Sequence, residues 1–161
     1  MPVLHVRKSP TTAADPDGNE VDVTPPQILI HEGPVVSVNV GVPSDLADKW
    51  RNMGLEIPEP VSGNALIDTG ATTTCIDDDV AKQLGLPTVD VAQMSSASGQ
   101  SEQPVYPVQL DITHSELVIE SSKSIGADLE DQGLVALIGR DTLSQCTLHY
   151  NGVTGDFTLS I

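Results

Sequence analysis

One short stretch of the chain, Ala65-Leu66-Ile67-Asp68-Thr69-Gly70-Ala71, places a carboxylate directly after an apolar strand. Strand side chains such as Leu66 and Ile67 are expected to be buried, so Asp68 is delivered to the edge of a hydrophobic core. A carboxylate in such a place costs free energy unless it is hydrogen-bonded or paired. It is therefore more often functional than incidental, and its partner has to be found.

Length and composition limit the classes of protein to consider. The chain has 161 residues, which suits one domain or one domain with a tail. Its formal net charge of −16 argues against nucleic acid and against anionic membrane surfaces as partners, because both need basic patches. Aromatic residues make up only 2% of the chain, so the core must be built from Val, Leu, Ile and Ala. No apolar run approaches the about 20 residues of a membrane span.

The cysteines and histidines predict neither a disulfide scaffold nor a metal site. Cys75 and Cys146 are too few for such a scaffold, and residues 1–8 contain no apolar stretch of signal-peptide length. We expect reduced thiols in a cytoplasmic protein, with a single disulfide as the alternative. The four histidines show no metal-ligand spacing, so no metal and no cofactor is predicted.

The rest of the chain is expected to be mainly β, with two or three short helices. Alternation and turn residues predict strands over 27–31, 35–40, 91–94, 105–112, 117–119, 134–138, 147–150 and 156–161. Helices are predicted over 44–53, with Ser44 as N-cap, over 77–84 and over 141–145. Residues 9–26 are polar and rich in turn residues, so residues 1–26 are expected to be an arm or mobile loop before a domain spanning 27–161.

A second motif, Leu137-Ile138-Gly139-Arg140-Asp141, lies downstream of the first. Two apolar residues followed by a glycine, with an arginine at a helix start, suit a short strand that passes beneath an active-site loop and then turns sharply. Between the motifs, the predicted strands 91–94 and 105–112 flank a stretch rich in Ser, Gly and Gln, residues 95–103. This pattern predicts a long hairpin with a flexible tip.

With both motifs and the hairpin, the chain resembles the retropepsin-like aspartic proteases, the single-domain class that includes retroviral proteases and bacterial relatives. The resemblance covers residues 27–161 and implies the acid-protease fold, a closed β-barrel with one lobe per chain. It implies that Asp68 is the catalytic residue and that Thr69, Gly70 and Ala71 support its loop. Thr69 would hydrogen-bond to a partner subunit, and Gly70 would let backbone and substrate approach closely.

The resemblance also gives roles to the second motif. Leu137, Ile138 and Gly139 would lie beneath the active-site loop, and Arg140 would brace it. In many viral relatives an Asp follows the Asp-Thr-Gly-Ala run and can pair with this arginine. Here Thr72 stands in that position, so Asp77 or a backbone carbonyl is expected to serve instead.

The hairpin is implied to be a flap that closes over substrate, with Ser98, Gly99 and Gln100 near its tip.

A single copy of the catalytic motif implies a homodimer. Peptide hydrolysis by this route needs two carboxylates that share one proton. The chain holds no second Asp-Ser/Thr-Gly, because Asp141-Thr142 continues with Leu143. The predicted function is an aspartic endopeptidase that cleaves proteins or peptides, with Asp68 of each chain at a two-fold axis. The alternative is a catalytically silent retropepsin-fold module that binds peptides or dimerises.

Overall fold

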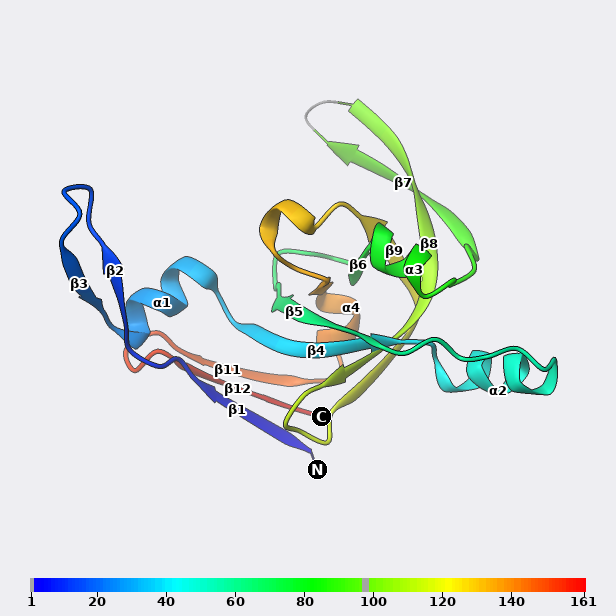
Figure 1. Ribbon diagram of the computed structural model, residues 1–161, viewed down its shortest axis with the longest axis horizontal. Helices are drawn as coiled ribbons and strands as arrows, with labels where there is room; N and C mark the ends of the chain where they lie inside the picture. The colour runs from blue at the N-terminus through cyan, green and yellow to red at the C-terminus, as the bar shows by residue number, and fades with distance from the viewer. Residues whose placement is uncertain (1, 97–98) are drawn as a thin grey trace.

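The computed structural model describes residues 2–96 and 99–161, and these are mainly β, as predicted (Figure 1). The strands are β1 (Val3–Arg7), β2 (Thr11–Ala14), β3 (Glu20–Val23), β4 (Val35–Gly41), β5 (Val61–Ile67), β6 (Cys75–Asp77), β7 (Asp90–Ser96), β8 (Gly99–Ile112), β9 (Val118–Ala127), β10 (Ala136–Ile138), β11 (Thr147–Asn151) and β12 (Asp156–Ser160). The helices are α1 (Pro25–Glu32), α2 (Ser44–Asn52), α3 (Asp78–Gln83), α4 (Arg140–Leu143) and the 3-10 helix η1 (Glu130–Gln132). None of these helices in the described part of the chain is long and apolar enough to cross a membrane.

A seven-stranded sheet forms the body of the molecule, in the order β4-β5-β10-β6-β9-β8-β7. Strand β4 pairs with both β5 and β8, so two sides of the sheet meet along this strand. Its buried side chains are mostly aliphatic, and Val38, Leu110 and Ile138 are fully buried. Each such side chain stabilises the fold by about 1.5–3 kcal/mol, which allows a core with very few aromatic rings. The closed barrel that the resemblance implies stays a prediction.

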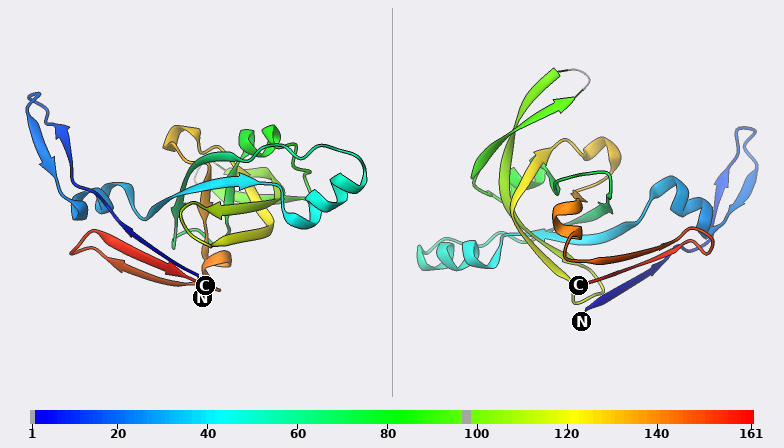
Figure 2. Two further views of the ribbon diagram at one scale, coloured as in Figure 1. Left: turned by 60° about the horizontal axis from the view of Figure 1, so that its bottom comes forward. Right: turned by 180° about the vertical axis from the view of Figure 1, so that it is seen from behind.

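The two ends of the chain form a second sheet, in the order β1-β12-β11 (Figure 2). Strand β1 pairs antiparallel with β12 along its whole length, and Phe157 and Leu159 of β12 are fully buried. Residues 1–26, expected to be an arm or mobile loop, contain the strands β1, β2 and β3. Local patterns could not show β1, since its partner strand lies at the other end of the chain. The domain boundary at residue 27 stays a prediction.

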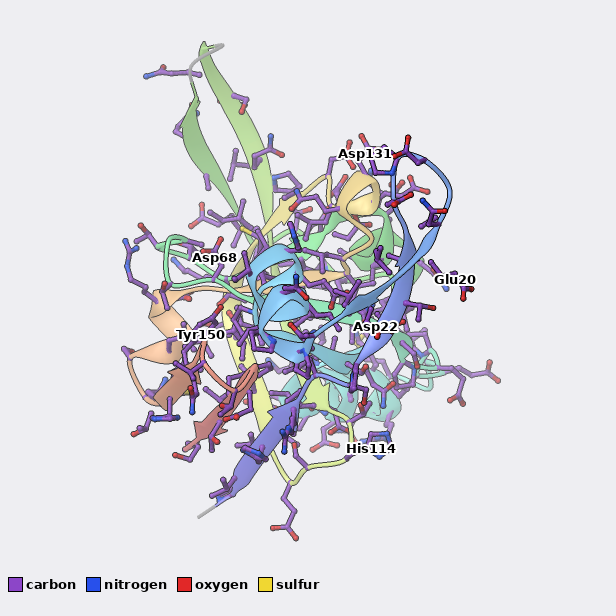
Figure 3. The ribbon with its side chains drawn as sticks, turned by 90° about the vertical axis from the view of Figure 1, so that its left-hand side faces the viewer. Glu20, Asp22, Asp68, His114, Asp131 and Tyr150 are labelled. Carbon is purple, nitrogen blue, oxygen red and sulfur yellow. The ribbon has the colours of Figure 1, made fainter. Side chains whose placement is uncertain are left out.

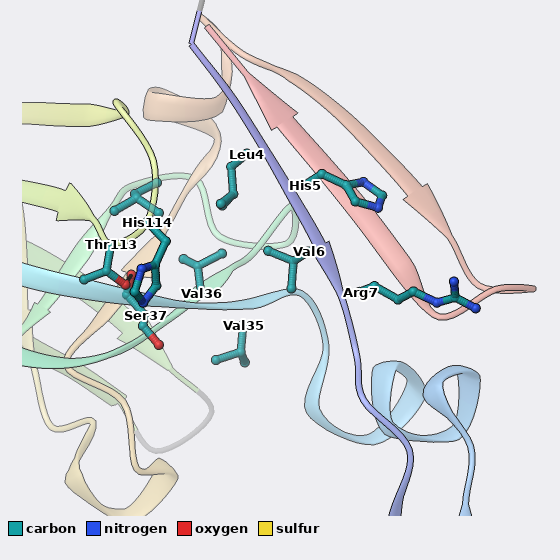
Figure 4. A pocket seen from close by; sticks show the side chains of 10 residues that line it. Leu4, His5, Val6, Arg7, Val35, Val36, Ser37, Thr113 and His114 are labelled. Atoms are coloured by element: carbon teal, nitrogen blue, oxygen red, sulfur yellow. Dashed lines mark hydrogen bonds between the residues drawn. The ribbon is translucent and has the colours of Figure 1, made fainter.

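A pocket of about 350 Å³ separates part of β1 from β4, with Leu4, Val6 and Val36 on its walls (Figure 4). None of its lining residues belongs to either sequence motif. It therefore marks incomplete contact between the two sheets and lies outside the candidate site.

Residues 27–31 belong to helix α1 and not to the predicted strand. The side-chain oxygen of Gln27 accepts a hydrogen bond from the Thr24 amide at 2.8 Å, and prolines occupy the first turn, where their missing N–H costs nothing. Gly33, with φ of 73°, ends the helix. Ile28 and Leu29 are both buried while Ile30 is 71% exposed, so burial does not alternate as it would in a strand, and the apolar run covers one side of a helix.

Helix α2 begins at Ser44 as predicted, but Ser44 is not its cap. Pro43 occupies the N-cap position. The Glu120 carboxylate on β9 accepts the Ser44 amide at 3.0 Å and also the Ser44 hydroxyl. These hydrogen bonds hold the pKa of Glu120 below its ordinary value. The start of α2 is therefore capped by a side chain from a distant strand, and not by the hydroxyl of Ser44.

Asp77 is a buried carboxylate at the start of α3, where the sequence predicted the first residue of a helix. As the N-cap, its Oδ1 accepts the amides of Asp79 at 3.1 Å and Val80 at 3.2 Å. Its Oδ2 accepts the amide of Leu129 at 3.0 Å, which ties α3 to the loop before η1. Three backbone donors and the positive end of the helix therefore compensate the buried charge.

We expect Asp77→Ala to lower the free energy of unfolding by about 3 kcal/mol, because it leaves these buried amides without an acceptor. Asp77→Asn keeps one acceptor oxygen and is expected to cost about 1 kcal/mol. Urea denaturation measures both. Asp79→Ala, on the exposed side of the same helix, is the control. Equal midpoints for the Ala variants at 77 and 79 would contradict the assigned role.

Candidate active site

Asp68 follows the end of β5, which lies between β4 and β10 in the main sheet. Strand β5 runs parallel to β10, with Leu66 opposite Leu137 and Ile67 opposite Ile138. The Asp68 amide continues this ladder by donating to the Ile138 carbonyl at 3.0 Å. The two sequence motifs are therefore neighbouring parallel strands, and the carboxylate emerges half-buried where they end (Figure 3).

The loop after Asp68 is folded around its carboxylate. The Gly70 amide donates to Asp68 Oδ1 at 2.8 Å, and the Ala71 amide donates to the Asp68 carbonyl at 3.3 Å. A Cβ at Gly70 would stand 3.0 Å from Oδ1, closer than nearly all side-chain contacts. Thr69 and Gly70 are exposed. The loop thus presents one carboxylate and a strip of accessible backbone on the same surface.

Arg140 reaches back to this loop from the start of α4. Its Nη1 donates to the carbonyls of Thr69 at 2.8 Å and Gly70 at 3.1 Å, and its Nη2 donates to the Thr72 hydroxyl at 2.9 Å. The sequence left Asp77 or a backbone carbonyl open as its partner, and the structure shows carbonyls. The planar guanidinium suits this arrangement, because it can donate to several acceptors at once.

Gly139 lies where the second motif crosses beneath the loop. It is buried, and its amide donates to Thr74 Oγ1 at 3.1 Å. A Cβ there would stand 2.5 Å from the carbonyl carbon of Thr73. Only glycine lets the two backbones pass so closely.

Thr74 and Asp141 form a network that the sequence analysis missed. The Asp141 carboxylate accepts the Thr74 amide at 2.9 and 3.0 Å and the Thr74 hydroxyl at 2.8 Å. Thr74 is fully buried and also lies 2.8 Å from the Thr142 hydroxyl. The Asp that follows Gly139-Arg140 was the available signal, because a carboxylate there can reach a loop that the same motif supports.

Carboxylates near the loop also act on Cys75 in β6. Burial raises the pKa of its thiol, and the charges of Asp141 and Asp68 raise it further. Both Cys75 and Cys146 are free, as predicted. Cys75 is therefore a small apolar core residue close to the loop, and its thiol is not activated.

The predicted hairpin between the motifs is present. Strands β7 and β8 pair from Asp90 opposite Val105 to Ser96 opposite Gly99. The polar stretch predicted as a tip is mostly strand, because polar side chains pair across it, as Gln93 does with Glu102 at 2.8 Å. Gly99 and Gln100 begin β8, and Ser98 lies outside the described residues. The hairpin projects beyond the other strands of the main sheet (Figure 1).

Comparison with known proteins gives one family match. A family model described as aspartyl protease matches residues 55–142. No curated protein matches the sequence.

Several solved structures are similar to this chain, and two of them are described here. One is the solution structure of Simian Foamy Virus (mac) protease, at 13% identity over 68% of this chain and 91% of that chain, with a TM-score of 0.44. The other is the crystal structure of a retropepsin-like aspartic protease from Rickettsia conorii, at 14% identity over 99% of this chain and 92% of that chain, with a TM-score of 0.46.

The segment matched by the family model contains both motifs and the hairpin between them. It begins before β5 and ends within α4, so it covers Asp68 together with Arg140. It also spans more than half of the chain. The chain belongs to the aspartyl protease family.

Proposed function

We propose that this chain is an aspartic endopeptidase whose active site is completed by a second copy of itself. The observation that carries the proposal is the single Asp68 carboxylate on a loop fixed by Gly70, Ile138 and Arg140. A chain with one such loop holds half of a two-carboxylate site, so two-fold association with Asp68 near the axis would supply the other half. The exposed Thr69 and Gly70 leave this part of the loop free for contact.

The chemistry follows from bringing two like charges together. Two carboxylates in contact cannot both ionise, so one holds a proton and the other acts as a base. The ionised carboxylate takes a proton from water, and the resulting nucleophile attacks the carbonyl carbon of the scissile peptide bond. The protonated carboxyl donates toward the carbonyl oxygen. The role of Asp68 is thus acid in one chain and base in the other.

The surrounding residues would position this pair. Thr69, Gly70 and Ala71 form the loop, and Leu137 and Ile138 support it from the neighbouring strand. The hairpin of β7 and β8, with Gly99 and Gln100 near its end, would cover a bound peptide. No cofactor is required by this route. The cytoplasmic location stays a prediction.

The proposal is tested by cleavage of an unbiased peptide library across a range of protein concentrations. Activity per chain should rise with concentration and level off as the dimer forms, and the rate should show a bell-shaped dependence on pH. Sedimentation analysis under the same conditions gives the mass. Cleavage by a strictly monomeric species would refute the shared site. A dimer without cleavage under any condition would favour the silent module.

We expect Arg140→Lys to lower kcat/KM about tenfold while costing only about 1 kcal/mol of unfolding free energy. A lysine ammonium cannot reproduce the fork that reaches Thr69, Gly70 and Thr72 together. Kinetics and thermal unfolding measure the two effects. Arg51→Lys alters an exposed ion pair to Asp48 and serves as the matched control, with no expected change in either quantity. Unchanged kinetics at Arg140→Lys would show that the loop holds its shape without the guanidinium.

A further inference from the structure

At the base of the β7–β8 hairpin, strand β8 changes its pairing partner, and we call this point the junction. Residues 99–105 of β8 pair with β7, and β8 pairs with β9 from Val105 onward. The ladder between β8 and β9 is irregular between Tyr106 and Val108, with Pro107 between them. Such irregularities bend a strand and re-aim what lies beyond them. The direction in which the hairpin leaves the sheet is therefore set at this point.

A side-chain contact fixes the junction to α3. Tyr106 is only 4% exposed, and its hydroxyl donates to Asp78 Oδ1 at 2.7 Å. The other carboxylate oxygen of Asp78 pairs with Lys82 at 2.5 Å. Burial opposes ionisation of Asp78, but the hydrogen bonds from Lys82 and Tyr106 prevail and hold its pKa below the ordinary value. The acceptor is thus a carboxylate, which makes the bond stronger than one between neutral groups.

The backbone beside this contact leaves no room for a side chain. A Cβ at Gly126 would stand 2.9 Å from the Tyr106 ring, 3.0 Å from Asp78 Oδ1 and 3.0 Å from Pro104. Pro104 pairs with Val91 of β7 and directly precedes the residues of β8 that pair with β9, so all three contacts lie at the junction. A glycine at this point of β9 therefore allows the ring and the carboxylate to meet.

Asp78 connects the junction to the catalytic loop. It begins α3, which follows β6 directly, and β6 follows the loop that starts at Asp68. Strand β6 is held against β10, the strand of the second motif. The hydrogen bond from Tyr106 therefore joins the hairpin base to the helix that follows the catalytic loop and β6.

We propose that Tyr106 is a positioning residue that, through Asp78, sets the angle of the hairpin over the catalytic loop. This inference rests on the proposed protease function. With the bond in place, the hairpin is held in the orientation that closes on a peptide. Without it, the closed orientation is less populated, and apparent substrate affinity falls by the same fraction. The bond acts on substrate capture and leaves the reacting groups unchanged.

The test compares Tyr106→Phe with the wild-type protein by peptide hydrolysis and by hydrogen exchange of the amides in 90–105. Phenylalanine keeps the buried ring, so folding is preserved. We expect KM to rise about tenfold, equivalent to about 1.4 kcal/mol, with kcat within about twofold and faster exchange in the hairpin. Asp78→Asn should act in the same direction, because it weakens the same bond.

Two controls separate this effect from general weakening. Tyr150→Phe removes a hydroxyl that donates to the Leu29 carbonyl at 3.3 Å in the terminal sheet, and should change neither KM nor hairpin exchange. Lys82→Met removes the exposed ion pair but keeps the Tyr106 bond, and should have a smaller effect than Tyr106→Phe. Wild-type KM and exchange in Tyr106→Phe would overturn the proposal, as would a loss confined to kcat. If the wild-type protein cleaves no peptide, the protease function fails, and hairpin exchange alone still decides the role of Tyr106.

Discussion

The Asp68→Asn variant is expected to lose peptide hydrolysis by a factor of about 10³ or more while keeping its fold and its self-association. The amide has nearly the shape of the carboxylate, and its oxygen can still accept the Gly70 amide, so the loop need not rearrange. What is lost is the group that takes a proton from water. Initial rates on a cleaved peptide and sedimentation analysis of the same preparation measure the two parts of this prediction.

The control for Asp68→Asn is Asp45→Asn, an exposed carboxylate in the first turn of α2. It changes net charge equally but lies on a helix that projects from the opposite part of the sheet (Figure 1). Its activity should match that of the wild-type protein. Undiminished cleavage by Asp68→Asn would remove the basis for an aspartic mechanism.

Mixing the wild-type protein with the Asp68→Asn variant tests whether the two carboxylates of a site come from different chains. If each site needs Asp68 from two copies, an excess of the Asn variant sequesters wild-type chains in dimers with one carboxylate. Activity per wild-type chain should then fall toward zero as the excess grows. If each chain carries a complete site, activity per wild-type chain stays constant at every ratio.

The local structure of both motifs could be predicted from the sequence because each motif is short and continuous. Asp68 through Ala71 and Leu137 through Arg140 each determine a strand end and a turn within a few residues. Their mutual placement required a family resemblance, since the parallel pairing of β5 with β10 joins segments far apart in the chain.

Most of the features that were missed depend on distant partners. Strand β1 exists because β12 pairs with it, and the start of α2 is capped by Glu120 instead of Ser44. Thr74 has no local signal, since its role follows from Asp141 arriving beneath the loop. In α1 the local signal was present, because Thr24 and Gln27 cap the helix, but three consecutive apolar residues outweighed it.

The substitution Gly139→Ala is expected to destabilise the protein by about 4 kcal/mol or more and to abolish activity. The backbone of Gly139 has φ of −85°, which alanine adopts freely, so the cost is purely steric. The added Cβ would meet the backbone of Thr73 and Thr74 at 2.5 to 2.8 Å. Backbone atoms cannot rotate away as a side chain can, so the strand of the second motif and the catalytic loop would be forced apart.

Two other glycines separate this clash from ordinary effects of adding a methyl group. Gly152→Ala, with its nearest contact at 3.5 Å and in a surface turn, should be nearly neutral. Gly133→Ala meets no atom within 4 Å but has φ of 66°, so it should cost about 1 kcal/mol in backbone strain alone. In chemical denaturation, Gly139→Ala should lose the most unfolding free energy, Gly133→Ala should lose less, and Gly152→Ala should lose almost none. A Gly139→Ala protein as stable as Gly133→Ala would mean that the loop and the second motif can move apart, and the close crossing would then not be what holds Asp68 in place.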